Sequence, residues 1–155
     1  MAGQNGKFVM KDGTVVVNGV DLSNRASQVT VNMPDDDVDM SSFQGGHYKE
    51  WGKGLSDASI DVQFFIDYQV GKVDDTLWPL KTTDTTFKMY CTPFQGAVAQ
   101  NNPMYGLDAR MFNYSPLTGQ IGQAATTTVT FRNGSAYGIT KGITPTDLAN
   151  FLART

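Results

Sequence analysis

Few residues of this chain have the chemistry that catalysis or metal binding requires. His47 is the only histidine and Cys91 the only cysteine among 155 residues. A serine or cysteine nucleophile would need His47 as its base, yet the nucleophile-elbow pattern G-x-S-x-G is absent. A zinc site needs three or four clustered ligands, which one histidine and one distant cysteine do not supply. We therefore interpret His47 as a loop residue and predict a protein that is not an enzyme and uses no cofactor.

Phosphate and calcium sites are also poorly matched. The Gly-Lys pair in "GGHYKEWGKGL" lacks the G-x-x-x-x-G-K-[ST] spacing, and no Ser or Thr follows Lys53. The acidic run "PDDDVDM" lacks the glycine and the glutamate that an EF-hand loop requires. Two interpretations of this run stay open: a solvated loop, or an acidic lining that repels passing DNA. Its carboxylates are Asp35, Asp36, Asp37 and Asp39.

Length and charge narrow the class of protein further. At 155 residues and 16.9 kDa the chain suits a single domain, residues 1–155, with its own apolar core. Twelve basic against 15 acidic side chains argue against a dedicated nucleic-acid binder, which normally presents a basic face. The N-terminus "MAGQNGKF" has no secretory pattern, and no apolar stretch approaches the roughly 18 residues of a membrane helix. We expect a protein made in the cytoplasm, without membrane partners.

Strand signals dominate the organisation of the chain. Residues 58–67, "ASIDVQFFID", place apolar side chains at every second position, which is the period of a half-buried strand. No long helix separates the strands, so we expect antiparallel pairing, because parallel pairs need long crossovers. The expected fold is therefore mainly β, an antiparallel β-sandwich or barrel. Five further segments alternate in the same way: "GTVVVNG", "QVTVNM", "TFKMYCT", "YGLDARMF" and "TTTVTFRN".

One short helix is predicted beside the sheet. In "VDDTLWPL" two aspartates occupy a first turn, where carboxylates suit the helix dipole, and Val73 and Leu77 lie one turn apart. Pro79 should end this helix, because proline lacks the N–H that an interior position needs. We expect a flanking helix from Val73 to Trp78.

A second short helix is predicted near the C-terminus, within an extension of residues 134–155. In "TPTDLANFLA", Thr144 is the expected N-cap, Pro145 the first helical residue and Asp147 the partner of the cap. The apolar stripe of this helix is small. A stripe of this size at a chain end suits docking on a neighbouring subunit.

A long polar segment, residues 34–56, precedes the clearest strand. Ordinary connections have roughly 4 to 6 residues, so a loop this long in a compact domain is usually functional. Its large apolar side chains alternate with glycines and would be poorly solvated on an isolated monomer. We interpret the segment as an inter-subunit loop; the alternative is that Tyr48 and Trp51 fold back on their own domain. The residues expected in the contact are Phe43, Tyr48, Trp51 and Leu55.

The order of several segments carries a resemblance to a known family. These segments are "VVVNGVDLSNRASQVTVN", "DDDVDMSSF", "GLSDASIDVQFFIDYQVGKVDDTLWPL" and "FNYSPLTGQIGQAATTTVTFRN". Together they resemble the major tail proteins, or tail tube proteins, of long non-contractile-tailed bacteriophages (siphophages). The resemblance spans about Thr14 to Arg132, and the set "GL-x-D-A-S-I", "F-x-D" and "LWPL" is its most distinctive part. The C-terminal "YGITKGITPTDLANFLART" is not part of the pattern.

The resemblance implies a structural protein of the virion. Six copies would form a ring, and rings would stack into a hollow tube through which DNA passes without specific binding. The long loop would reach the adjacent ring, residues 1–12 would form an N-terminal arm, and a tape-measure protein and other tail proteins would be partners. Acidic side chains are expected to face the channel: Asp35, Asp36, Asp37, Asp39, Asp61 and Asp67.

Two alternatives stay open at this stage. One is another phage component, such as a head-decoration or head-tail joining protein, which would form single rings or surface trimers. The other is a carbohydrate-binding β-sandwich module that uses Tyr48, Trp51 and Trp78 as stacking platforms. Sugar binding would require these aromatic rings to be exposed together on a stable monomer.

Overall fold

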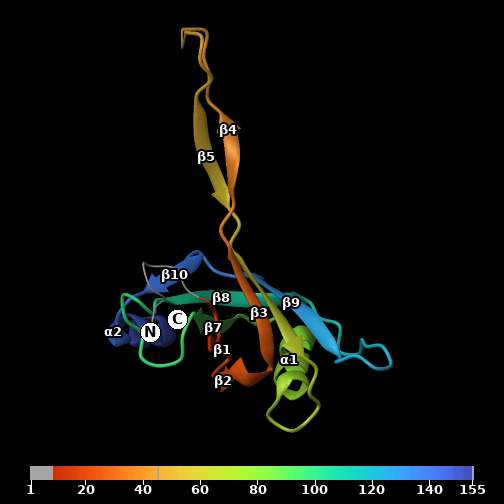
Figure 1. Ribbon diagram of the computed structural model, residues 1–155. Coiled ribbons are helices and arrows are strands. Elements are labelled where there is room, and N and C mark those ends of the chain that lie inside the picture. The colour runs from red at the N-terminus through yellow and green to blue at the C-terminus, as the bar shows by residue number, and fades with distance from the viewer. Residues whose placement is uncertain (1–8, 45, 155) are drawn as a thin grey trace.

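The computed structural model describes residues 9–44 and 46–154, so most of the predicted N-terminal arm, residues 1–12, lies outside the described residues. The described chain is mainly β, with a compact body and one long projection (Figure 1). The strands are β1 (Thr14–Val17), β2 (Val20–Asp21), β3 (Ala26–Asn32), β4 (Asp35–Asp39), β5 (Trp51–Ser56), β6 (Ser59–Phe65), β7 (Phe87–Thr92), β8 (Met104–Asn113), β9 (Thr126–Asn133) and β10 (Ile139–Gly142), and the helices are α1 (Val73–Thr82) and α2 (Pro145–Ala153).

The strands of the body form one antiparallel sheet, in the order β2-β1-β7-β8-β9-β6-β3. β8 is long enough to pair with two strands along the same edge, first β10 and then β9. Every strand pair among the described residues is antiparallel, as the absence of long crossover helices predicts.

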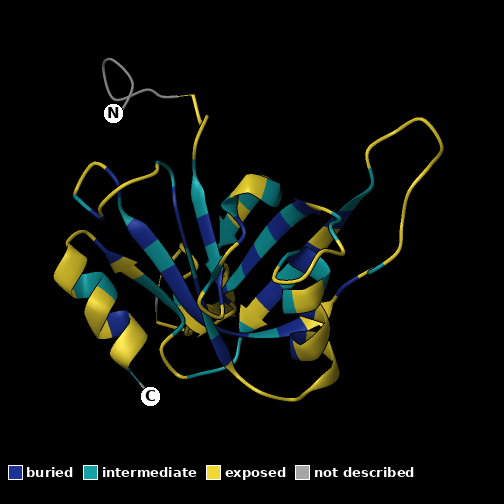
Figure 2. Cartoon of the chain, turned by 90° about the horizontal axis from the view of Figure 1, so that it is seen from below, coloured by how far each residue is buried: buried dark blue, intermediate teal, exposed yellow. Residues whose placement is uncertain are grey.

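The sheet curves until its two ends share one core. Val15 and Val17 of β1 belong to the same apolar cluster as Ile60, Val62 and Phe64 of β6, and Val29 and Val31 of β3 pack against it. Figure 2 shows buried residues alternating with partly buried ones along β1 and β6, as a curved sheet with one inner face requires. The antiparallel sandwich or barrel expected from the sequence is thereby confirmed. Cys91 lies in the core, and burial raises the pKa of its thiol to about 12.

Helix α1 is longer than predicted, because Pro79 does not end it. The helix continues to Thr82, with Pro79 in its interior. Proline removes only its own N–H, whereas its carbonyl still accepts from the backbone N–H of Thr83. Leu80, one residue beyond the proline, is buried against the core, and this packing offsets the lost hydrogen bond.

Helix α2 begins as predicted but docks differently. Thr144 and Asp147 form the expected capping box, with Pro145 at the first helical position. Phe151 does not face a neighbouring subunit. It packs on its own sheet with Met104 and Val98, above Gly106, where an added Cβ would lie 2.7 Å from the Phe151 ring.

A buried carboxylate ties the C-terminus to the sheet. Asp108 of β8 pairs with Lys88 at 2.6 Å and with Arg154 at 2.9 Å. The Arg154 guanidinium also lies over the rings of Tyr137 and Phe151. Burial alone raises the pKa of Asp108, but the hydrogen bonds from Lys88 and Arg154 outweigh it, so this pKa lies below its ordinary value.

We predict that Asp108→Asn lowers the free energy of unfolding by about 3 kcal/mol at neutral pH, because it leaves two partly buried cations without their counter-charge. The folded-state pKa of Asp108 is depressed, so its stabilisation is present above the unfolded pKa of about 3.9 and is lost as pH falls through the folded pKa. Urea denaturation across pH should show the difference between wild type and variant shrinking in acid.

Asp84 provides a matched control for this prediction. It also pairs with an arginine, Arg110, but its side chain is 87% exposed. Exposed pairs contribute little, so Asp84→Asn should unfold like wild type. Equal losses in the two variants would contradict the role assigned to the buried pair.

Candidate self-assembly surface

The segment 34–56, predicted to be a loop, is a β-hairpin that projects from the body. β4 and β5 pair antiparallel and form a sheet of their own, separate from the main sheet (Figure 1). The two strands within this segment were not predicted from the sequence. The hairpin continues the β3–β6 pair, in which Asn32 lies opposite Ser59, and the backbone N–H of Asp57 donates to the Pro34 carbonyl at its base.

The glycines of β5 leave room for side chains of β4. Gly52 lies opposite Val38, and a Cβ on Gly52 would lie 2.2 Å from the Met40 sulfur. A Cβ on Gly54 would come within 3.0 Å of Val38 and of Asp36. The side chains of Asp36 and Val38 in β4, and of Met40 directly after it, therefore lie over the glycines of β5.

The opposite face of the hairpin carries both charged and aromatic side chains. Asp37 lies opposite Lys53, and Asp39 lies opposite Trp51. Lys53 pairs with Asp35 at 3.4 Å, and the Lys49 ammonium lies 5.8 Å from the centre of the Trp51 ring. The hairpin therefore combines apolar area with a defined charge pattern.

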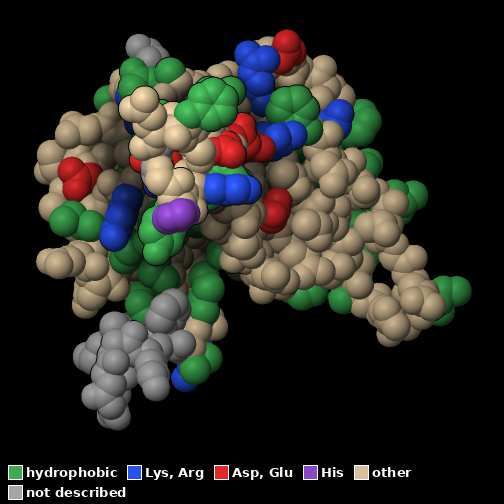
Figure 3. Space-filling model, turned by 90° about the horizontal axis from the view of Figure 1, so that it is seen from above, with side chains coloured by type: hydrophobic (Ala, Val, Ile, Leu, Met, Phe, Trp, Pro, Cys, Tyr) green, Lys and Arg blue, Asp and Glu red, His purple; other side chains and the backbone are tan. Residues whose placement is uncertain are grey.

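The hairpin segment also carries the whole net charge of the chain. Residues 34–56 contain five of the 15 acidic and two of the 12 basic residues, which gives −3, and the remaining residues sum to zero. Figure 3, which looks down on the projecting hairpin, shows red, blue and apolar green side chains side by side there. Two hairpins that meet tip to tip would repel each other, because both are negatively charged. The body of a second copy has no net charge, so it would not repel the hairpin.

Local hydrogen bonds keep two of the hairpin carboxylates ionised. Hydrogen bonds from Ser56, and then from Lys53, lower the pKa of Asp35 below its ordinary value. The hydroxyl and backbone N–H of Ser41 do the same for Asp39. Both groups are fully solvated, so they affect the charge of the hairpin rather than the stability of the fold.

The four predicted contact residues all lie on the hairpin, and none folds back on the body. Trp51 is 61% exposed, Leu55 is 81% exposed, and Phe43 and Tyr48 are almost completely exposed. This excludes the alternative in which Tyr48 and Trp51 pack on their own domain. An isolated two-stranded hairpin is marginally stable in water, so a partner surface would both cover and order this one.

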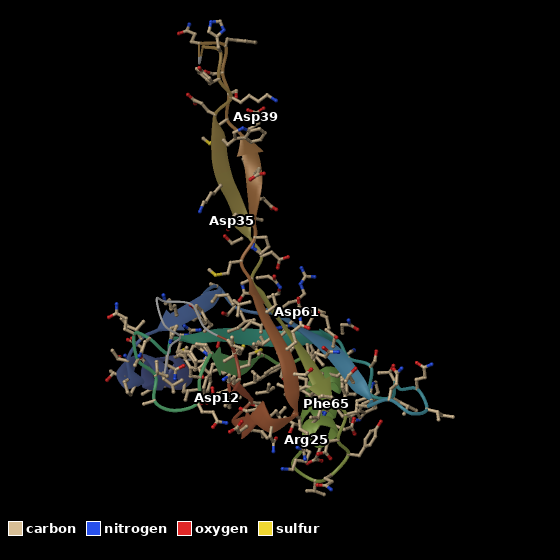
Figure 4. The ribbon with its side chains drawn as sticks, viewed as in Figure 1. Asp12, Arg25, Asp35, Asp39, Asp61 and Phe65 are labelled. Atoms are coloured by element: carbon tan, nitrogen blue, oxygen red, sulfur yellow. The ribbon has the colours of Figure 1, made fainter. Side chains whose placement is uncertain are left out.

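The six predicted channel residues do not form one cluster. Asp35, Asp36, Asp37 and Asp39 lie on β4, whereas Asp61 lies on the body (Figure 4). Asp61 accepts a hydrogen bond from Asn32 at 3.0 Å. It points to the polar face of β6, away from the buried Ile60 and Val62.

Asp67 lies beyond the far end of β6 and is already paired. Its carboxylate accepts from Arg25 at 2.6 Å. The backbone N–H of Gln69 and then Arg25 hold the pKa of Asp67 below its ordinary value. The carboxylate is therefore ionised but neutralised by a partner from the same chain.

The structure separates the aromatic residues of the carbohydrate-binding alternative. Tyr48 and Trp51 lie on the hairpin, whereas Trp78 lies on α1, at the other end of the body (Figure 1). Three rings so arranged do not form one platform. Among the described residues no group of three or more His, Cys, Asp or Glu is placed to hold a metal ion, and no helix is long and apolar enough to cross a membrane.

Comparison with solved structures identifies the fold. A chain from the virion of a native gene transfer agent particle superposes with a TM-score of 0.65 at 17% identity, covering 89% of this chain and 99% of that one. A chain from the tail of an empty gene transfer agent particle, refined with helical C6 symmetry, gives 0.64 at 16% identity over 90% and 99%. The fold is a phage-like tail tube fold.

This tail tube fold extends to a contractile system. A chain from the sheath/tube terminator of an extracellular contractile injection system (PVC) matches with a TM-score of 0.62 at 9% identity, covering 90% of this chain and 99% of that one. No protein-family model and no curated protein sequence matches this chain. The likeness therefore lies in the backbone arrangement, with little shared sequence.

Truncating the hairpin aromatics should leave the stability of the monomer unchanged. We predict that Phe43→Ala alters the free energy of unfolding by no more than about 0.5 kcal/mol, because the ring contacts water and not the core. The matched variant Phe64→Ala removes a fully buried ring and should cost about 3–5 kcal/mol. Denaturant titrations of dilute protein measure both; a large loss in Phe43→Ala would mean that the hairpin packs on its own body.

Proposed function

We propose that this protein is the tail tube protein of a long-tailed, siphophage-like bacteriophage and that it is a component of the virion tail. Copies associate into rings, which we propose are hexamers, and the rings stack into a hollow tube that conducts DNA. The observation that carries the proposal is the tail tube fold, matched over about nine-tenths of the chain by tail components of phage-like particles. The role is mechanical and needs no catalytic group.

The projecting hairpin supplies the contact between rings in this proposal. It extends away from the body, carries exposed Phe43, Trp51 and Leu55, and has no described partner surface on its own chain. Its charge of −3 opposes pairing with another hairpin. We therefore assign the hairpin to the neutral body of a copy in the next ring. Such a head-to-tail contact does not close on itself, so it propagates along an axis.

The polar face of β3, β6 and β9 suits the wall of a DNA channel. Asp61, Thr130 and Thr30 lie side by side across the three strands. Arg132 of β9 lies on the same face, but its guanidinium is paired with Asp57 at 2.7 Å. A face of hydroxyls and carboxylates with its arginine paired gives phosphates little cationic charge to bind, so few counterions are released. We propose that Asp61 and some of the hairpin carboxylates face the channel, while Asp67 contributes less because Arg25 neutralises it. A reconstruction with all six on the outer wall would refute this assignment.

The remaining partners follow from the proposed role. A tape-measure protein would occupy the channel before DNA enters it, and other tail proteins would cap the two ends. A head-decoration or head-tail joining protein is the alternative role, with closed rings or trimers in place of a tube. The long hairpin favours the tube, because a single closed ring leaves its apolar side chains uncovered.

A variant without the hairpin tests whether the hairpin is needed for the stacking of rings but not for the folding of the monomer. Asn32 lies opposite Ser59 at the end of the β3–β6 pair, so Met33 and Ala58 follow as the next two residues. Residues 34–57 can therefore be replaced by Asn-Gly, which favours a two-residue hairpin turn and keeps the buried Ala58. We expect the variant to keep its β signal in circular dichroism but to form no tubes, whereas wild type forms tubes at high concentration. Negative-stain microscopy with light scattering measures both.

Two results would contradict the proposal. Tubes formed by the shortened variant would exclude the hairpin as the stacking element. Wild-type protein that stays monomeric, or forms only small closed oligomers when other tail proteins are added, would exclude the tube itself and favour the decoration role.

A further inference from the structure

A second projection leaves the body in a different direction from the hairpin. The connection between β8 and β9, residues 114–125 (the 114–125 arm), extends sideways, at the right of Figures 1 and 2. It contains no charged residue. Leu117 is 85% exposed and Ile121 is fully exposed, so two large aliphatic side chains face water near its end.

The base of the 114–125 arm is held firmly although its tip is exposed. The Tyr114 hydroxyl donates to Asp74 at 2.7 Å, and the Tyr68 hydroxyl donates to the Pro116 carbonyl at 2.6 Å. On the return side the backbone N–H of Ile66 donates to the Ala125 carbonyl at 3.0 Å. Anchors on both sides fix the direction of the arm, which lowers the ordering cost of inserting its tip into another molecule.

An apolar pocket of about 420 Å³ lies on the other flank of the body. It lies close to the start of the described chain, with Met10 in its wall, and none of its lining residues is charged. Among the lining side chains are Met10, Val29, Val31, Pro93, Pro103 and Tyr105. Tyr105, in the pocket wall, lies at the start of β8, whereas the 114–125 arm follows the end of β8 at Asn113, so pocket and arm lie at opposite ends of this strand.

The arm and the pocket complement each other in shape and in polarity. One is an uncharged projection with aliphatic side chains at its end, and the other is an uncharged hollow lined by aliphatic and aromatic side chains. Figure 3 shows the arm as a tan and green projection without red or blue. Because they lie on opposite flanks, one chain cannot bring its own arm to its own pocket without refolding.

We propose that the 114–125 arm of one copy inserts Leu117 and Ile121 into the apolar pocket of a second copy. The contact is heterologous: arm meets pocket, and each copy keeps one free arm and one free pocket for further neighbours. Such contacts close into a ring when the rotation between copies allows it. The inference rests on the proposed self-assembly and identifies the lateral contact within a ring, as distinct from the axial contact of the hairpin.

Mixed cysteine cross-linking tests this contact directly. One variant carries Ile121→Cys at the arm tip and a second carries Asn101→Cys at the exposed rim of the pocket. Both variants also carry Cys91→Ala, because the native Cys91, although buried, lines the pocket that the arm tip is to enter. Under mild oxidation we expect the mixture to give at least tenfold more disulfide-linked dimer than either variant alone, because arm and pocket meet only between the two. Lys81→Cys, an exposed position on α1, mixed with Ile121→Cys is the matched control.

Each cross-linking result either supports or overturns the arm–pocket contact. No excess of dimer in the arm–pocket mixture overturns the proposal, and so does efficient dimerisation of Ile121→Cys alone, which would mean that arm meets arm. An excess equal to that of the Lys81→Cys control would show unspecific collision and also overturn it. The test is independent of tube formation: tubes without the cross-link refute the lateral contact alone, and the cross-link without tubes refutes the tube alone.

Discussion

The antiparallel pairing of β3 with β6 is the contact on which the rest of the structure depends. These two strands close one end of the main sheet, bury Ile60, Val62 and Phe64, and then continue beyond the sheet as the base of β4 and β5. The direction of the hairpin is therefore set by a strand pair that is itself locked by core packing. A slip of one residue would turn the core side chains of β6 outward and rotate the hairpin as well.

The body and its two projections obey different physical constraints. The body buries its apolar side chains within one chain and fixes its C-terminus through the ion pairs of Asp108. The hairpin and the 114–125 arm expose theirs, and each is uncovered on the monomer. The hairpin carries the net charge of the chain, whereas the arm carries none. The hairpin and the 114–125 arm differ in chemistry and point in different directions. This suits an assembly in which one contact runs along an axis and the other runs around it.

Much of the body could be predicted from the sequence, because the period-2 pattern reports burial directly. The strand at residues 59–65 and the capping box at Thr144 were both predicted correctly. The hairpin strands were missed for a physical reason. β4 is rich in aspartate and β5 in glycine, residues that strands otherwise avoid, and here cross-strand fit with Val38 and Met40 overrides propensity.

Other features could not be predicted from the sequence pattern, because they depend on contacts between residues that are distant along the chain. Asp108 alternates with the core residues Leu107 and Ala109, so its position predicts exposure, yet the C-terminal segment covers it from 46 residues away along the chain. The extent of α1 beyond Pro79 depends on the burial of Leu80. The predicted contact residues of segment 34–56 were placed together, because they share one hairpin. The predicted acidic residues were not, because Asp61 and Asp67 lie at different places along the body.

The most direct test of the central claim is a helical reconstruction by electron microscopy of the purified protein at high concentration. The account predicts a hollow tube of stacked rings in which density for β4 and β5 crosses from each ring to the body of a subunit in the next. Particles in which the hairpin ends in solvent, or a protein that remains monomeric, would contradict it.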